Sequence, residues 1–229
     1  MPIKNSTVVG LVIAVLSISA CIKQVERGLD EETVEGDITP RLPAAWVLFG
    51  PTDGKEAFDA VGGFDELIKH GGERSAVFFA TDVTNDDQAR LTQRFLADQF
   101  RGKRIRFAAY LKTNQVNGWA GLWLRVDTID KHAWAFDDME DFAIDGTTDW
   151  RQYQIVLDVP QDGAVIYLGA HLYGRGQVWM DDCTFEVVGD DVPVTDGQRM
   201  RGGYPRVYSI PQFMEYIPVN LDFEETEFL

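Results

Sequence analysis

The sequence predicts an all-β fold, an antiparallel β-sandwich. About nine short runs of residues alternate between apolar and polar side chains, which is the pattern of strands that rest one face on a core. Residues that favour turns separate these runs at regular spacing, and no stretch has the period of a convincing amphipathic helix. A chain of 229 residues with 45% hydrophobic content can bury the core that such a sandwich needs.

The clearest alternation lies in residues 104–127. Odd-numbered residues are apolar from Ile105 to Leu111, and even-numbered residues are apolar from Ala120 to Val126. The polar stretch TNQVNG lies between the two halves, so we expect a pair of antiparallel strands that are joined there. Each strand of the pair would then place its apolar side on the core.

The remaining strands are expected on both sides of this pair. Leu91, Gln93 and Phe95 alternate with arginine and threonine, so we interpret their run as a strand although its pattern also allows a helix. Residues 50–73 are rich in Gly and Asp and are expected to form a long loop. Gly174-Arg175-Gly176 is expected to make a tight turn. The other expected strands are residues 45–50, 75–81, 89–97, 133–136, 150–160, 164–174 and 177–188.

The first twenty residues are expected to be a signal peptide. Lys4 precedes an apolar run, VVGLVIAVLSISA, that is too short to span a bilayer comfortably. The run ends in Ile18-Ser19-Ala20-Cys21, which resembles the lipobox of bacterial lipoproteins. This resemblance implies cleavage before Cys21, acylation of that cysteine and, because Ile22 follows it, an outer-membrane lipoprotein that is periplasmic or surface-exposed. An ordinary secretory signal and an uncleaved anchor helix are the alternatives.

Composition and charge exclude several classes of function. The formal net charge of -16 argues against nucleic acid or an anionic membrane surface as a partner, because both would be repelled. Two cysteines are too few for a disulfide scaffold or a cysteine-based zinc site. The three histidines have no metal-ligand spacing, and neither a GxSxG elbow nor a phosphate loop is present. We therefore predict that the chain is not an enzyme.

Several motifs between Trp46 and Val188 resemble jelly-roll carbohydrate-binding modules of the galactose-binding-like kind. They are RGKRIRFAAYLKT, GWAGLWLRVD, GTTDWRQYQIVLDVP and the closing hairpin GRGQVWMDDCTFEVV. The alternation in this hairpin places Asp181 on the same side as Trp179, so we expect the carboxylate to face the core. In the family an aspartate at this position helps to hold a structural calcium, and Asp222 and Glu224 would be further ligands here. The alternative is a carboxylate that backbone amides or an arginine satisfy.

Four segments follow from these patterns. We expect a signal peptide over residues 1–20, the lipidated Cys21 and a tether over 21–44, a β-sandwich over 45–189, and a Pro/Gly-rich tail over 190–229. Residues 28–32 and 219–225 are two candidates for the opening strand of the resembled modules, and residues 219–225 are the closer match. We hypothesise that they return to the edge of the sandwich as a strand, in this chain or in a neighbour; they could also be the remnant of a second module.

The side chains opposite the core predict a function. A purely structural face would more often carry Thr, Lys and Glu, whereas aromatic rings can stack on the C–H faces of sugars and polar groups can hold their hydroxyls. We predict a non-catalytic glycan-binding lipoprotein, with Tyr110, Trp123 and Arg125 as the strongest candidates, although the two sheets cannot both contribute to one groove. The alternatives are a protein-interaction or envelope-assembly module, and a face that a loop or the tail covers. The full set of candidate ligand-binding residues is Tyr110, Trp119, Trp123, Arg125, Gln152, Tyr167, His171 and Tyr173.

Overall fold

The computed structural model describes residues 36, 38–39, 41–49, 60–80, 88–130, 133–195 and 214–225. The expected signal peptide, Cys21 and most of the tether lie outside these residues. The described part contains ten strands, one short 3₁₀-helix (η1, Glu140–Phe142) and no α-helix, so the predicted all-β fold is confirmed. A helix long and apolar enough to cross a bilayer does not occur in these ranges.

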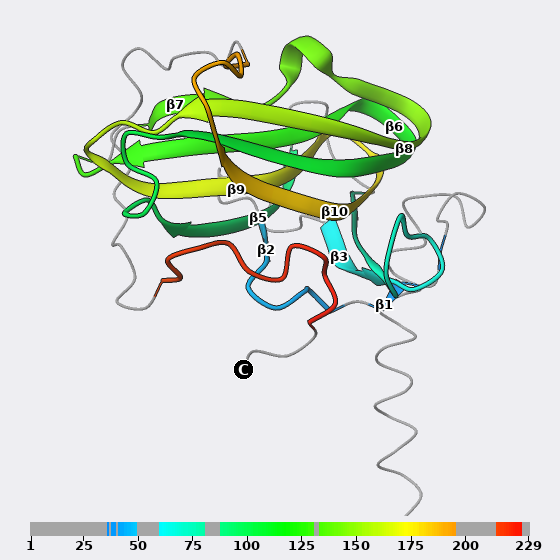
Figure 1. Ribbon diagram of the computed structural model, residues 1–229. Coiled ribbons are helices and arrows are strands. Elements are labelled where there is room, and N and C mark those ends of the chain that lie inside the picture. The colour runs from blue at the N-terminus through cyan, green and yellow to red at the C-terminus, as the bar shows by residue number, and fades with distance from the viewer. Residues whose placement is uncertain are drawn as a thin grey trace, which may run out of the picture. The chain divides into compact units, whose positions relative to one another are not determined.

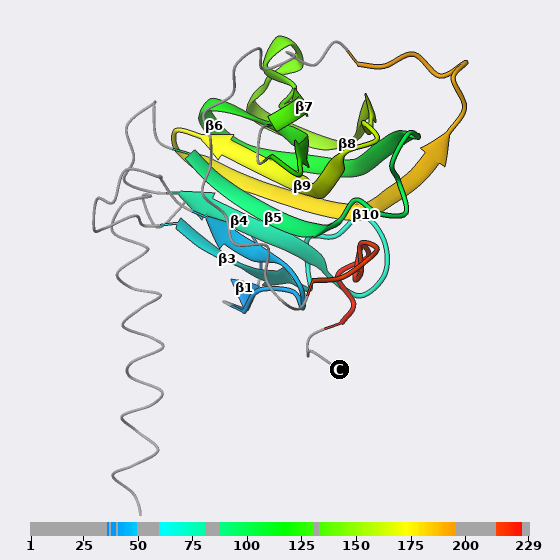
Figure 2. The same ribbon diagram turned by 90° about the vertical axis from the view of Figure 1, so that its left-hand side faces the viewer.

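All ten strands belong to one antiparallel sheet that folds over itself into a sandwich. The strand order is β1-β3-β4-β10-β6-β9-β5-β2, and β7 and β8 also pair with β6. Figures 1 and 2 show β6, β8, β9 and β10 as long, curved strands. The bounds are β1 Ile38–Thr39, β2 Val47–Phe49, β3 Ala60–Asp65, β4 Ser75–Ala80, β5 Gln88–Leu96, β6 Arg104–Thr128, β7 Ala133–Asp137, β8 Ile144–Asp158, β9 Gly163–Tyr173 and β10 Gly176–Val188.

The expected pair of strands at residues 104–127 is one continuous strand, β6, so that prediction is wrong. The first half of β6 pairs with β10 and β8, and its second half pairs with β9 and β7. Asn117 does not form a turn of its own, because its backbone N–H donates to Arg175 and its side chain accepts from Arg175 in the β9–β10 turn. Gln115 has a φ of 50°, which helps the strand to bend at this point.

The passage of β6 from one layer to the other defines the two sheets. The first sheet holds β1, β3, β4, β10, β8 and the first half of β6, and the second sheet holds β2, β5, β9, β7 and the second half of β6. One buried cluster fills the space between them, with Phe78, Phe107 and Ile155 from the first sheet and Phe95 and Leu122 from the second. The alternation of the strands predicts this core correctly.

β3 lies within the stretch that we expected to be one long loop. Its residues pair with β4 from Ala60↔Ala80 to Asp65↔Ser75. The two glycines of the strand hide the pattern in the sequence, because Gly63 lies where a Cβ atom would be 2.0 Å from the backbone oxygen of Thr39. Only a residue without a side chain allows the neighbouring backbone to approach this closely.

A β-bulge in β10 reverses the side that we predicted for Asp181. The register with β6 shifts between Asp181 and Thr184, and Asp182 has a left-handed φ of 46°. Met180 and Cys183 therefore both belong to the core cluster, although three positions separate them. Asp181 and Trp179 lie on the outer side of the first sheet, where both are buried.

The C-terminal segment 214–225 returns to the sandwich, although its residues form turns and not the strand we expected. Phe223 is fully buried in the core cluster, and its ring centroid lies 5.1 Å from that of Trp46. The Asn220 side chain donates to the backbone oxygens of Ala44 and Glu225, and the Trp46 indole donates to the Asn220 backbone. Figure 1 shows this segment, in red, beside the blue segment around β2.

Candidate functional site

The outer side of the second sheet brings six of the eight predicted ligand-binding residues together. Directly opposite residues of antiparallel strands point to the same side, so the register of β5, β9 and β6 defines rows of neighbouring side chains. We call this surface the β5–β9–β6 face. Its rows are Gln88–Tyr173–Trp119, Arg90–His171–Gly121, Thr92–Gly169–Trp123 and Arg94–Tyr167–Arg125.

Two glycines lie in the middle rows of this face. At Gly169 (φ 154°) a Cβ atom would lie 1.9 Å from the backbone oxygen of Leu91, so the close approach of β5 requires glycine. At Gly121 a Cβ atom would lie 3.1 Å from the backbone oxygen of Asp138 and 3.4 Å from His171 Nε2. The turn after β7 therefore packs directly on β6 at Gly121.

Aromatic rings form two stacked pairs on the face. Trp119 and Tyr173 are half-buried and nearly parallel, with ring centroids 4.5 Å apart and an interplanar angle of 11°. Trp123 and Tyr167 lie deeper, with centroids 6.3 Å apart, and Met214 of the C-terminal segment packs on their cluster. Trp123 is only 3% exposed, so it is not the uncovered stacking surface that the sequence predicted.

One charged group of the face, Arg125, is compensated by a carboxylate. Arg125 Nε lies 2.8 Å from Asp127 Oδ1, and the guanidinium lies 4.3 Å from the centre of the Tyr167 ring. The Arg90 guanidinium lies 5.4 Å from the centre of the Trp123 ring, a cation–π geometry. Burial, together with repulsion by Arg90, lowers the pKa of His171 to about 3, and the backbone of Asp138 opposes this shift. His171 is therefore neutral at physiological pH.

Several buried polar atoms of the face lack a hydrogen-bond partner. They are Thr92 Oγ1, Trp123 Nε1 and Gln88 Oε1, and among the described residues nothing accepts from or donates to them. His171 Nε2 also makes no well-aligned hydrogen bond, although the nearby backbone of Asp138 favours the protonated ring. Folded proteins satisfy most of their buried polar groups, so this concentration on one face of one sheet calls for an explanation.

Tyr110 and Gln152 lie on the first sheet, directly opposite each other in β6 and β8. The His70 ring covers Tyr110 with a centroid distance of 3.6 Å and an interplanar angle of 15°, and His70 Nδ1 lies 2.6 Å from Asp182 Oδ2. Trp150 meets His70 edge-on, with ring centroids 5.8 Å apart. The structure thus separates Tyr110 from Trp123 and Arg125, because the two halves of β6 belong to different sheets.

The carboxylates predicted to hold calcium accept hydrogen bonds from backbone amides. Asp181 Oδ2 accepts from the N–H groups of His70 at 2.7 Å and Gly71 at 3.0 Å, and Glu224 Oε1 accepts from Glu73 at 2.6 Å. Asp222 accepts from Glu224. Within the described ranges, no three His, Cys, Asp or Glu side chains are arranged to hold a metal ion. These contacts match the amide alternative for Asp181, and burial raises the pKa of this carboxyl.

Sequence reasoning missed Gln88, Arg90 and Thr92. All three lie on β5, whose alternation was recognised, so their common outward direction could be inferred. The sequence carries no signal that β5 neighbours β9, and β9 neighbours the second half of β6. Only that pairing places Thr92 in one row with Trp123.

Comparison with curated proteins finds one relative of note. The chain is 39% identical over 181 residues to YbfP of Bacillus subtilis (strain 168), which is named as an uncharacterized HTH-type transcriptional regulator. The match takes in 79% of this chain and 56% of the relative, so the chain spans little more than half of the relative's length. No protein-family model matches the chain.

Carbohydrate-binding modules are among the solved structures that the chain resembles. The xylan-binding CBM22-1 domain of Paenibacillus barcinonensis Xyn10C has a TM-score of 0.45 at 13% identity, over 67% of this chain and 96% of that chain. TmCBM61 in complex with β-1,4-galactotriose has a TM-score of 0.41 at 14% identity, over 70% and 98%. The enzymatically active domain of bacteriophage CBA120 tailspike protein 4 has a TM-score of 0.47 at 16% identity, and the match covers 63% of this chain and 20% of that chain. Such scores and identities establish neither a common fold nor a common ligand.

Proposed function

We propose that the chain is a non-catalytic binding protein whose β5–β9–β6 face holds a small neutral saccharide. The observation that carries this proposal is the group of buried polar atoms without partners, Thr92 Oγ1, Trp123 Nε1 and Gln88 Oε1, among aromatic rings. Sugar hydroxyls can donate to and accept from such atoms, while the C–H faces of the sugar stack on the rings. Burying these atoms without a partner costs about 1–3 kcal/mol each, which a ligand would recover.

A neutral ligand fits the charge state of Arg125 and His171. Arg125 is paired with Asp127, and His171, with a pKa of about 3, is neutral at physiological pH. The ligand would enter beside Trp119 and Tyr173, which are half-buried. To reach the deeper atoms it would displace Met214, whose flexible, unbranched side chain can repack at low cost.

The relative supports a binding role for the shared region. The match is longer than all undescribed stretches of this chain together, so it must run through the sandwich. The described part of the sandwich has no α-helix, and we infer that the helix-turn-helix in the relative's name lies in the part that this chain does not span. A ligand-sensing module joined to a DNA-binding part is a simple explanation. Here the lipobox-like Cys21 would instead hold the module at a membrane.

The test uses the full chain, purified in detergent. It is screened on an array of neutral and acidic oligosaccharides, and the affinity for each hit is measured by calorimetry. Trp123→Phe keeps a ring but loses Nε1, and Thr92→Val keeps the shape but loses Oγ1. We expect each variant to bind a neutral hit about 5- to 150-fold more weakly, which corresponds to 1–3 kcal/mol.

Tyr110→Phe is the matched control, because it removes a hydroxyl from the opposite sheet and should leave the affinity unchanged. The proposal fails if no oligosaccharide binds, or if Trp123→Phe and Thr92→Val bind every hit as tightly as the wild type. Binding that only Tyr110→Phe weakens would move the saccharide site to the first sheet.

A further inference from the structure

β8 forms an edge of the first sheet. It pairs only with β6, so its other side has no strand beside it among the described residues. Two hydrogen bonds to Thr195 show which backbone groups of β8 point away from β6. The Thr195 N–H donates to the Val156 carbonyl, and the Val156 N–H donates to Thr195 Oγ1. The backbone groups of Val156 therefore point away from β6.

The same direction follows for Gln152 and Gln154. In an antiparallel pair, every second residue turns its N–H and C=O toward the neighbouring strand, and the residues between them turn these groups outward. Gln152 and Gln154 have the same parity as Val156 and pair with β6 without a shift of register between them. Both residues are exposed, and in the described part of the chain their backbone groups have no partner. This row can accept an added strand.

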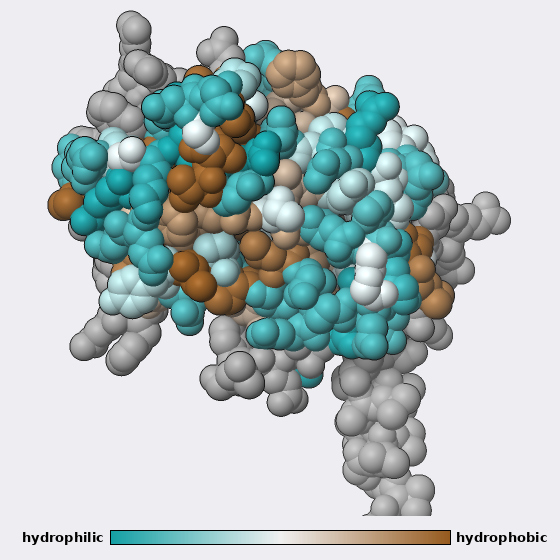
Figure 3. All heavy atoms as spheres, viewed as in Figure 1, coloured by the Kyte–Doolittle hydropathy of each residue, from teal (hydrophilic) through white to brown (hydrophobic). Residues whose placement is uncertain are grey.

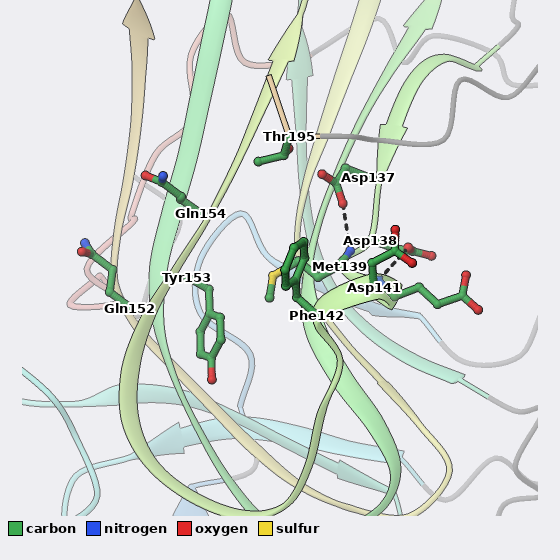
Figure 4. A pocket seen from close by; sticks show the side chains of 10 residues that line it. Asp137, Asp138, Met139, Asp141, Phe142, Gln152, Tyr153, Gln154 and Thr195 are labelled. Carbon is green, nitrogen blue, oxygen red and sulfur yellow. Dashed lines mark hydrogen bonds between the residues drawn. The ribbon is translucent and has the colours of Figure 1, made fainter. Parts of the chain in front are cut away.

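A pocket of about 370 Å³ lies along this row. Residues Gln152–Gln154 form one wall, the 137–142 turn with η1 forms the other, and Thr195 closes one end. Figure 4 shows Phe142 beside Met139 between the two walls, and the Phe142 ring is 75% exposed. The only charged side chains in the lining are carboxylates: those of Asp137, Asp138, Glu140 and Asp141.

We propose that the β8 edge at Gln152 and Gln154 binds an extended, lysine- or arginine-rich peptide, which adds to the sheet as a further strand. Unpaired N–H and C=O groups would bond the backbone of the peptide, and its side chains would alternate between the acidic turn and solvent. Charge complementarity selects a basic partner. It disfavours a second copy of this chain, because the formal net charge is -16 and β8 itself carries Asp145, Asp149 and Asp158 against one basic residue, Arg151.

Charged side chains often protect edge strands from pairing, and the acidic turn would repel acidic chains in this way. It leaves the edge open to a partner of opposite sign. This site lies along the β8 edge of the first sheet and takes a peptide, whereas the proposed saccharide site lies on the second sheet; the turn at Asp138 adjoins both.

The test measures fluorescence anisotropy of labelled octapeptides in which Lys or Arg alternates with Val or Thr, using the full chain. Acidic peptides of the same pattern, with Glu in place of the basic residue, are the reference. Gln154→Pro removes the outward N–H, and proline is tolerated at an edge position whose N–H faces away from the sheet. Gln154→Ala is the matched control, because it keeps the backbone donor.

We expect basic peptides to bind and acidic ones not to bind. Gln154→Pro should weaken binding about tenfold, and Gln154→Ala should stay within about twofold of the wild type. If Gln154→Pro does not fold, the double variant Glu140→Gln, Asp141→Asn tests whether basic peptides bind beside the acidic turn. It should weaken the binding of basic peptides several-fold and reduce the salt dependence of that binding.

Three results would overturn the proposal. The first is equal binding of basic and acidic peptides, and the second is equal binding of basic peptides by Gln154→Pro and wild type. The third is a dimer in sedimentation experiments that Gln154→Pro abolishes, since the edge would then pair with a second copy of the chain.

Discussion

Replacing Phe223 with alanine tests whether the C-terminal segment is part of the fold. Phe223 is fully buried and packs against Trp46 with the two rings tilted by 50°, and the hydrogen bonds of Asn220 hold the segment against the 44–46 stretch. Gln93 adds a reciprocal pair of hydrogen bonds to the backbone of Val219. A Phe→Ala change at a site of this kind removes about 3–5 kcal/mol of unfolding free energy, because lost burial and the cavity left behind add together.

The assay is urea unfolding, followed by tryptophan fluorescence and by circular dichroism. For a domain of this size about 1 kcal/mol corresponds to about 2–4 °C, so the melting temperature should fall by roughly 6–20 °C. Tyr216→Ala is the matched control, because this aromatic lies in the same segment and is 58% exposed; it should change the unfolding free energy by less than about 0.5 kcal/mol. If Phe223→Ala and Tyr216→Ala unfold at the same urea concentration as wild type, the segment does not contribute to the core.

Three further predictions concern ionisable groups. His171 is neutral in the folded state, with a pKa of about 3, but binds a proton below pH 6.5 when unfolded; wild type should therefore lose about 1.4 kcal/mol per pH unit relative to His171→Gln as the pH falls from 6.5 to 4.5. The free energy of unfolding is measured by urea unfolding at several pH values. If it falls with pH by the same amount in wild type and His171→Gln, the prediction is wrong. Asp181→Ala should speed amide hydrogen exchange at His70 and Gly71, which lose their acceptor, whereas Glu66→Ala should not. Because Asp181 already accepts these bonds, added calcium should leave the wild-type melting temperature unchanged, and a rise that Asp181→Ala abolishes would establish the metal site.

The strands could be predicted because alternation is a local property. β4, β5, β7, β9 and β10 lie close to their predicted positions, since a strand with one face on a core must repeat with a period of two. The pattern failed where the backbone departs from regular pleating. The bulge at Asp182 and the glycines of β3 change which side chains face inward, and neither leaves a clear trace in the hydrophobic pattern.

The candidate site could be predicted only in part. The alternation along β6 and β9 correctly predicted which side chains point away from the core. For this reason the sequence placed four aromatic residues on one outer face: Trp119, Trp123, Tyr167 and Tyr173. The partner strand that brings Thr92 beside Trp123 comes from a different part of the chain, and no local pattern specifies it. Burial of Trp123 likewise depends on chain segments that pack over the face, Met214 among them.

The all-β class, the inward and outward sides of most strands and the formal net charge of -16 could be read from the sequence. Only folding shows that β6 is one strand shared by two sheets, that the C-terminal segment places Phe223 in the core, and that no described strand pairs with the outer edge of β8 beside the acidic turn. The physical reason is the range of the interactions. Alternation acts between neighbours in the chain, whereas pairing partners, bulges and the satisfaction of buried polar atoms depend on residues that only folding brings together.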